Sequence, residues 1–190
     1  MATVSPKRAT IDDLLRTEGK AELIGGRIVH FMPSGFQPSQ VSLEIAASLK
    51  VYARGAGGGY AFADGMGFTV SELSSGRESF GPDASYYLGT APRNRMRFIE
   101  GPPTFAVEVR SENDYGSAAA RAMADKRADY FEAGTLVVWD VDPRAEQIHV
   151  YRISDLAHPT TYTRGEIAEA EPAVPGWRID VDEVFGRPPV

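Results

Sequence analysis

The sequence predicts a single α/β domain with a mixed β-sheet, a βαβ core and flanking helices. Its 190 residues suit one domain, and 43% apolar residues are enough for a hydrophobic core. Two apolar runs, residues 104–109 and 135–141, flank an alanine-rich helical segment at 117–133. A strand, helix and strand of these lengths form a βαβ crossover, so this part of the sheet should be parallel. No repeat or linker interrupts residues 1–190, and the core is expected at about 10–186.

The first third of the chain predicts a short helix, a hairpin and a long helix. Thr10 is a good N-cap for a helix that follows it at once. Residues 21–32 form two apolar runs around Gly25-Gly26, which is typical of a β-hairpin. Apolar side chains recur at helical spacing over residues 38–54, and the glycines at 55–59 should end that helix.

The middle of the chain predicts strands at residues 60–70 and 82–88, joined by a polar loop at 71–81. A second loop is expected at 91–101. Residues 104–109 are apolar on both faces, which favours a central strand.

After the helix at 117–133, which Gly134 should end, the chain predicts more strands. Residues 135–141 are expected to be buried, and the flanking hairpins should make the sheet mixed. Trp139 and Trp177 are expected in the core. The expected sheet and core segments are 147–153, 160–163, 177–181 and 184–185.

Composition narrows the chemistry. There are no cysteines, and the three histidines are scattered, so any metal must be held by oxygen ligands, as magnesium, manganese and calcium are. The net charge of −6 argues against broad, non-specific nucleic-acid binding. Residues 1–10 lack a signal-peptide core, and no apolar run reaches the roughly 20 residues of a membrane span. We therefore expect a cytoplasmic protein without a membrane partner.

Two carboxylates stand beside apolar strands. Asp83 follows Pro82, and Glu108 lies near the end of the run at 104–109. Burying a carboxylate costs several kcal/mol unless it is paired or holds a metal. Two such groups would repel each other unless a divalent cation lay between them. The pair predicts half of a magnesium site; in a second interpretation, the two carboxylates cap backbone amides.

Lys126 shares one helical stripe with Met123, Tyr130 and Ala133, so it is expected to face the sheet and to need an anionic partner. In the competing interpretation, its stem packs while its amine reaches solvent. Glu22 precedes an apolar strand and is a further candidate, with a solvated strand-edge charge as its simpler interpretation.

Several stretches, taken together and in this order, resemble the PD-(D/E)XK nuclease superfamily and, more closely, the bacterial Uma-two family of restriction-type endonucleases. They cover roughly residues 10–186. The matching stretches are residues 22–29, 82–84, 107–111, 126–134, 138–143, 150–152, 174–179 and 183–185.

The resemblance implies a restriction-endonuclease-like fold in which Asp83 and Glu108 ligate Mg²⁺ (or Mn²⁺), with the Val109 carbonyl as a third ligand. Glu22 would contribute directly or through a water. Lys126 would be the catalytic lysine.

The chain departs from the superfamily's simplest pattern at Arg110, where a lysine is usual two residues after the acid. Arg110 is then expected to contact phosphate. Related chains tend to carry a histidine near the start of the long helix, where this chain has Gln37 and Ser39.

Arg93, Arg95 and Arg97 alternate along the loop before Pro102, so an extended segment would present all three on one side to a nucleic-acid backbone. A solvated loop is the simpler interpretation.

These inferences predict a magnesium-dependent endonuclease that hydrolyses DNA phosphodiester bonds. Cutting both strands of a duplex is simplest with two sites related by a two-fold axis, which favours a homodimer. The main alternative is a catalytically silent copy of the fold that binds nucleic acid or a protein partner, and a third, weaker hypothesis is a metal-dependent hydrolase of a small phosphate ester.

Overall fold

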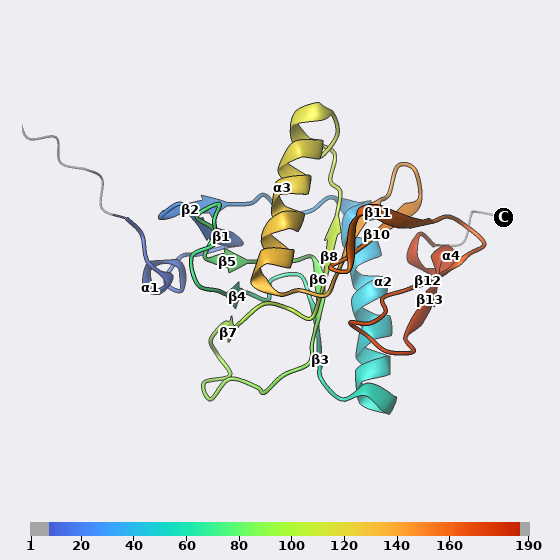
Figure 1. Ribbon diagram of the computed structural model, residues 1–190, viewed down its shortest axis with the longest axis horizontal. Coiled ribbons are helices and arrows are strands. Elements are labelled where there is room, and N and C mark those ends of the chain that lie inside the picture. The colour runs from blue at the N-terminus through green and yellow to red at the C-terminus, as the bar shows by residue number, and fades with distance from the viewer. Residues whose placement is uncertain (1–7, 187–190) are drawn as a thin grey trace, which may run out of the picture.

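The computed structural model describes residues 8–186, and a six-stranded sheet in the order β11-β10-β9-β8-β6-β3 runs through its centre (Figure 1). β8 and β9 are parallel and are joined by the crossover helix α3 (Ser117–Ala133), while the other neighbours are antiparallel. The predicted βαβ core and mixed sheet are therefore confirmed. The strands are β3 Tyr60–Ala63, β6 Ala84–Tyr87, β8 Phe105–Val109, β9 Val137–Asp142, β10 Gln147–Arg152 and β11 Asp155–Tyr162.

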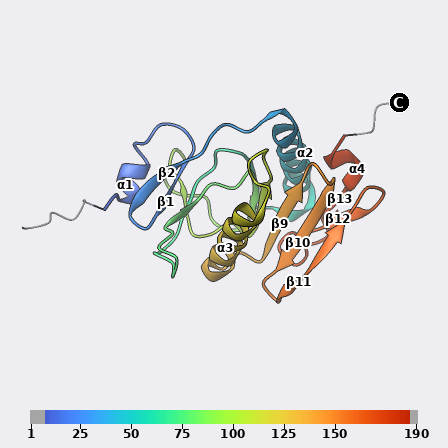
Figure 2. The same cartoon turned by 90° about the horizontal axis from the view of Figure 1, so that it is seen from above.

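Helices α3 and α2 (Phe36–Tyr52) cover opposite faces of this sheet (Figure 2). Successive side chains of a strand point to opposite faces. In β8, Phe105, Val107 and Val109 therefore pack into the cluster that contains α2, whereas Ala106 packs with residues of α3. Glu108 consequently points to the α3 face.

Three aromatic rings form the centre of the core on the α2 side. Trp139 is fully buried and Trp177 is 3% exposed, and their ring centroids lie 5.2 Å apart. Phe105 contacts both rings, at 5.2 and 5.8 Å. The prediction that both tryptophans belong to the core is confirmed.

The N-terminal elements form where the sequence predicts them. Thr10 caps α1 (Ile11–Leu14), and its side chain accepts a hydrogen bond from the amide of Asp13. The hairpin consists of β1 (Ala21–Ile24) and β2 (Arg27–His30), and both glycines of its turn have positive φ angles. It forms a separate two-stranded sheet, so the expectation that flanking hairpins make the main sheet mixed is wrong for this hairpin.

The expected strand at 60–70 is wrong, because a turn at Asp64-Gly65 divides it. The second half, β4 (Phe68–Thr69), belongs to a three-stranded sheet in the order β5-β4-β7. Its partners β5 (Ser79–Phe80) and β7 (Ile99–Glu100) arise from segments expected to be loops. Strands of two residues are too short to show an alternating pattern.

The long helix α2 differs slightly from its predicted boundaries. α2 begins two residues before the expected position, since the first turn of a helix tolerates Pro38. It continues as a π-helical turn, η1 (Ala53–Gly57). The prediction that the apolar pair at 184–185 closes the core is confirmed, since Val184 is buried in the core and Phe185 packs against it. Val184 ends the helix α4 (Val181–Val184), which follows the antiparallel pair β12 (Ile167–Glu169) and β13 (Arg178–Asp180).

Residues 1–7, which make up most of the segment predicted to lack a signal-peptide core, lie outside the described residues. Within residues 8–186, no helix combines the length and the apolar composition needed to cross a bilayer.

The aromatic centre predicts a large stability effect. Replacing the fully buried Phe105 by alanine should lower the free energy of unfolding by about 3–5 kcal/mol, because contacts with two indole rings are lost and a cavity remains. Urea denaturation measures this change. Met96→Ala is the control, since Met96 is 93% exposed and its loss should stay within about 0.5 kcal/mol. A similar effect for both variants would contradict this account of the core.

Candidate active site

A cavity of about 660 Å³ lies where the hairpin, the start of α2, the end of β8 and α3 meet. Its lining includes Lys20, Asp83, Glu108, Val109 and Lys126. Strands β6 and β8 bring the two acids together, because Ala84 pairs with Val107 in an antiparallel register, which puts the preceding Asp83 opposite Glu108.

Lys126 lies between two carboxylates. Its Nζ is 2.8 Å from Glu108 and 3.1 Å from Glu22 Oε1. Tyr130, one turn further along α3, donates its hydroxyl to Glu108 Oε1 at 2.7 Å. The Lys126 side chain is only 14% exposed, so the inward orientation predicted from the helical stripe is confirmed and the solvent-reaching interpretation is wrong.

Glu22 is completely buried, which rules out the solvated strand-edge interpretation. Besides Lys126, it is paired with Arg77, and its Oε1 accepts the amide of Gly81 at 3.0 Å. Arg77 in turn lies 2.8 Å from Asp129 of α3. Sequence reasoning missed Arg77, because it lies in a polar segment with no periodic pattern.

The surroundings shift the pKa values of the Glu22 and Glu108 carboxyls in opposite directions. Burial raises the pKa of Glu22, but attraction to Lys126 and Arg77 outweighs it, so the net pKa is lowered. Burial likewise raises the pKa of Glu108, and here the charges of Asp83 and Glu22 add to the rise, so the net pKa is raised despite Lys126. Glu22 is thus the firmly ionised partner of Lys126.

Asp83 has one oxygen bound to the backbone and the other to a lysine. Its Oδ2 accepts the amide of Val109 at 2.8 Å, so the backbone-capping interpretation describes part of its environment. Its Oδ1 lies 2.7 Å from Lys20 Nζ. Lys20 was not singled out from the sequence, where it is only a polar residue ahead of a hairpin strand.

The oxygen atoms that line the cavity determine whether it can hold a divalent cation. Among residues 8–186, no cluster of three or more acidic, histidine or cysteine side chains is arranged to hold a metal ion. Asp83, Glu108 and Val109 nevertheless line one cavity. Magnesium is usually bound through one or two carboxylates, with waters and substrate phosphate as the remaining ligands. The oxygen donors present fit that open kind of site.

Arg110 does not line this cavity. It forms an ion pair with Asp140 at 2.7 Å and lies 3.2 Å from Asp142, both on β9. A side-chain hydrogen bond to Asp140 is the main cause that raises the pKa of Arg110. Arg127 of α3 pairs with the same Asp140 at 3.1 Å. Arg110 therefore joins the end of β8 to its neighbour.

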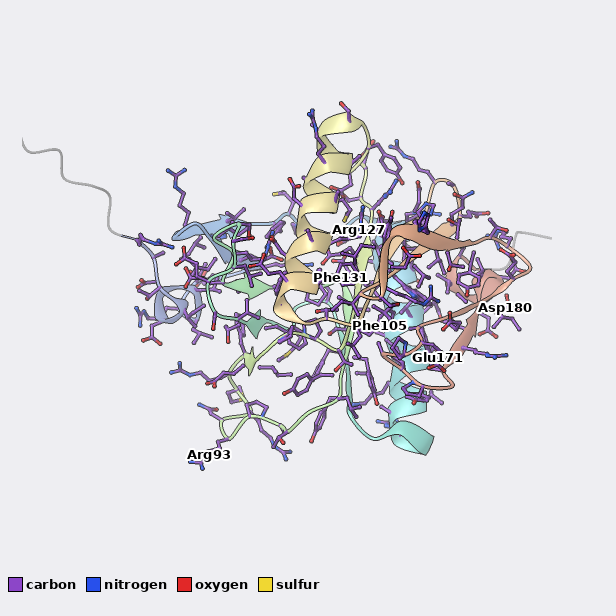
Figure 3. The ribbon with its side chains drawn as sticks, viewed as in Figure 1. Arg93, Phe105, Arg127, Phe131, Glu171 and Asp180 are labelled. Carbon is purple, nitrogen blue, oxygen red and sulfur yellow. The ribbon has the colours of Figure 1, made fainter. Side chains whose placement is uncertain are left out.

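The arginine-rich loop is exposed and lies apart from the cavity. Residues 94–97 form a turn closed by a bond from the Arg97 amide to the Asn94 carbonyl, so the expected extended segment is wrong. Arg93 lies at the tip of this loop, far from Arg127 on α3 (Figure 3). Neither Arg93 nor Arg95 lines the cavity that contains Asp83.

Gln37 and Ser39, at the start of α2 where the resemblance led us to expect a histidine, each take part in a hydrogen bond. Gln37 donates a hydrogen bond to the carbonyl of Pro143 at 3.2 Å. Ser39 is exposed, and its carbonyl accepts a hydrogen bond from the hydroxyl of Ser42.

Comparison with known proteins identifies the fold and the family of this chain. A crystal structure from Anabaena variabilis, described as a "putative nuclease belonging to DUF820", superposes with a TM-score of 0.71 at 19% identity, over 93% of this chain and 97% of that one. Residues 9–182 match the Uma2 family, described as "Putative restriction endonuclease", and the chain belongs to this family. A search of curated proteins found no match.

The buried pair of Arg77 and Glu22 predicts a test of the cluster. Arg77→Met should lower the free energy of unfolding by about 3–5 kcal/mol, because Glu22 keeps a buried charge with one partner fewer. The double variant Arg77→Met with Glu22→Gln should be more stable than Arg77→Met alone, since the carboxylate is gone. Chemical denaturation measures both, with the exposed Arg93→Met as control. Equal stability of the single and double variants would contradict the pairing.

Proposed function

We propose that this protein is a metal-dependent endonuclease of the PD-(D/E)XK type that hydrolyses DNA phosphodiester bonds. One observation carries the proposal: Lys126 lies 2.8 Å from Glu108 in a cavity that Asp83 also lines. Two acids in one cavity can hold a divalent cation, and a lysine beside them can stabilise the charge that develops on a phosphoryl group during hydrolysis. Membership of the Uma2 family supports the assignment.

Asp83 and Glu108 would supply carboxylate oxygens to Mg²⁺ or Mn²⁺, and Val109 would supply its backbone carbonyl. When bound, the ion polarises a phosphoryl oxygen and lowers the pKa of water. The hydrogen bond from the Val109 amide holds Asp83 in place, and that from Tyr130 holds Glu108. These bonds fix the carboxylates before the substrate arrives, so little reorganisation is needed.

Lys126 would orient the attacking water and stabilise the negative charge that develops on the phosphoryl oxygens. Its two carboxylate neighbours favour the ammonium form, which can donate up to three hydrogen bonds. Glu22 would act through Lys126: fully buried and anchored by Arg77, it holds the amine at the cavity wall.

The remaining arginines are proposed as substrate contacts in two different regions. Arg110, which is 22% exposed, would reach phosphate from beside its partner Asp140. Arg93 and Arg95 would bind the DNA backbone away from the cavity, where their exposed guanidinium groups are open to solvent. A homodimer would bring a second site to the opposite strand.

A second candidate is a silent module of the same fold that binds nucleic acid or a protein partner. A specific observation favours it: Asp83 and Glu108 each have a lysine within 2.8 Å, so the acids are neutralised without any metal. The two candidates differ in whether divalent metal binds and whether DNA is cut.

Cleavage of supercoiled and single-stranded DNA tests the proposal. Wild type should cut with magnesium or manganese and not with chelator. Asp83→Ala should abolish cleavage, and Lys126→Ala should slow it by about 10²–10⁴-fold, because the donor to the water and the phosphoryl group is lost. Lys50→Ala, on the exposed side of α2, is the matched control and should cut normally. A folded wild type that neither cuts DNA nor binds either metal would favour the silent module.

The loop arginines predict a change in salt dependence. Each arginine that contacts a phosphate contributes a slope of about −0.9 to the plot of log affinity against log salt concentration for duplex DNA. The double variant Arg93→Ala with Arg95→Ala should therefore flatten that slope by nearly two. Fluorescence anisotropy with duplex DNA between low and moderate salt measures it, with the exposed Arg16→Ala as control. An unchanged slope would place both arginines outside the DNA interface.

A further inference from the structure

Lys20 is a second lysine in the cavity, and the mechanism above gives it no role. It precedes β1, and its side chain is 22% exposed. Its Nζ lies 2.7 Å from Asp83 Oδ1 and 2.7 Å from Asp64 Oδ1. The ammonium group thus bridges two carboxylates, only one of which belongs to the proposed metal site.

The bridge follows from the fold. Asp83 is fixed on its other side, since its Oδ2 accepts the Val109 amide, so Oδ1 is the oxygen left for a cation. Asp64 belongs to the turn that ends β3, and its side chain is 39% exposed. No hydrogen bond from a backbone amide to the Asp64 carboxylate is among the contacts of the described residues, so Lys20 is its identified partner.

We propose that Lys20 is a positioning residue that exchanges with a divalent cation at Asp83 while it stays paired with Asp64. Without a divalent cation it neutralises Asp83; when a divalent cation takes the Asp83 oxygen, Lys20 stays on Asp64 and remains at the cavity wall. This inference rests on the proposed function, because it assigns the Asp83 oxygen to a metal ion.

The proposal predicts opposite changes in metal affinity when Lys20 or Asp64 loses its charge. Lys20 competes with the ion for Asp83, so removing its charge should tighten metal binding. Asp64 draws Lys20 away from Asp83, so removing its charge should weaken metal binding. A purely structural bridge predicts otherwise, because the loss of either partner would disturb the same region and weaken binding in both variants.

Electron paramagnetic resonance of Mn²⁺, titrated into the full chain without DNA, measures affinity independently of activity. Lys20→Met should bind Mn²⁺ about tenfold more tightly, because a unit charge in hydrogen-bond contact with the ligand is removed. Asp64→Asn should bind several-fold more weakly. Lys20→Arg keeps the charge and should stay close to wild type. Lys50→Met, on the exposed side of α2, is the control for a general loss of positive charge.

The double variant Lys20→Met with Asp64→Asn completes a double-mutant cycle for this pair. With Lys20 absent, the Asp64 substitution should no longer weaken binding, so the double variant should resemble Lys20→Met. Asp83→Asn, introduced into wild type and into each variant, should abolish Mn²⁺ binding at this site. Its loss shows that the measured ion is the one bound at Asp83. Circular dichroism and thermal unfolding of every variant exclude loss of the fold as the cause.

Three results would overturn the inference. If Lys20→Met leaves Mn²⁺ affinity unchanged or weakens it while wild type binds at Asp83, the exchange is wrong and the proposed nuclease site stands. If Asp64→Asn weakens binding equally with and without Lys20, Asp64 acts by another route. If wild type binds no Mn²⁺, the proposed function fails and the exchange fails with it.

Discussion

The pairing of Lys126 with Glu22 and Glu108 is the interaction on which the arrangement of the site depends. Its three members come from the separate hairpin, the central sheet and the crossover helix. Burying either glutamate without a partner would cost several kcal/mol. The positions of the three elements are therefore coupled, since the lysine satisfies both carboxylates only when all three meet. The cavity lies at this junction and owes its shape to it.

Acidic and basic side chains alternate around the Lys126 pairing. Because each acid contacts a base, these ionised groups can be partly buried. Three acids meet three bases around the cavity, and each acid has a basic neighbour within hydrogen-bonding distance. The acids are Glu22, Asp83 and Glu108, and the bases are Lys20, Arg77 and Lys126. Each of these three acids is therefore paired with a base when no metal ion is bound. A divalent cation must consequently displace an ammonium group from a carboxylate, so metal affinity depends on the bases as much as on the acids.

The parts of the fold and site that follow from local patterns could be predicted from the sequence. The βαβ core follows from two apolar runs around a helical segment, and the inward direction of Lys126 follows from its spacing to Tyr130. Arg77 and Lys20 could not be found in this way. Their partners are 55 and 63 residues away in the chain, and nothing local distinguishes either from an exposed basic residue. The two-residue strands β5 and β7 were missed for a related reason, because tertiary pairing with β4 rather than alternation defines them.

The position of Arg110 offers a physical account of why a helix lysine faces the acids. Glu108 of β8 is the register partner of Asp140 of β9, and both carboxylates point to the α3 face. The consecutive residues Lys126 and Arg127 of α3 each pair with one of them. Arg110, two residues after Glu108, bonds Asp140 through two of its nitrogens. A guanidinium fixed in that planar geometry is not free to turn toward Glu108. Asp140 thus holds Arg110 in place, and the basic side chain that pairs with Glu108 comes from helix α3 instead.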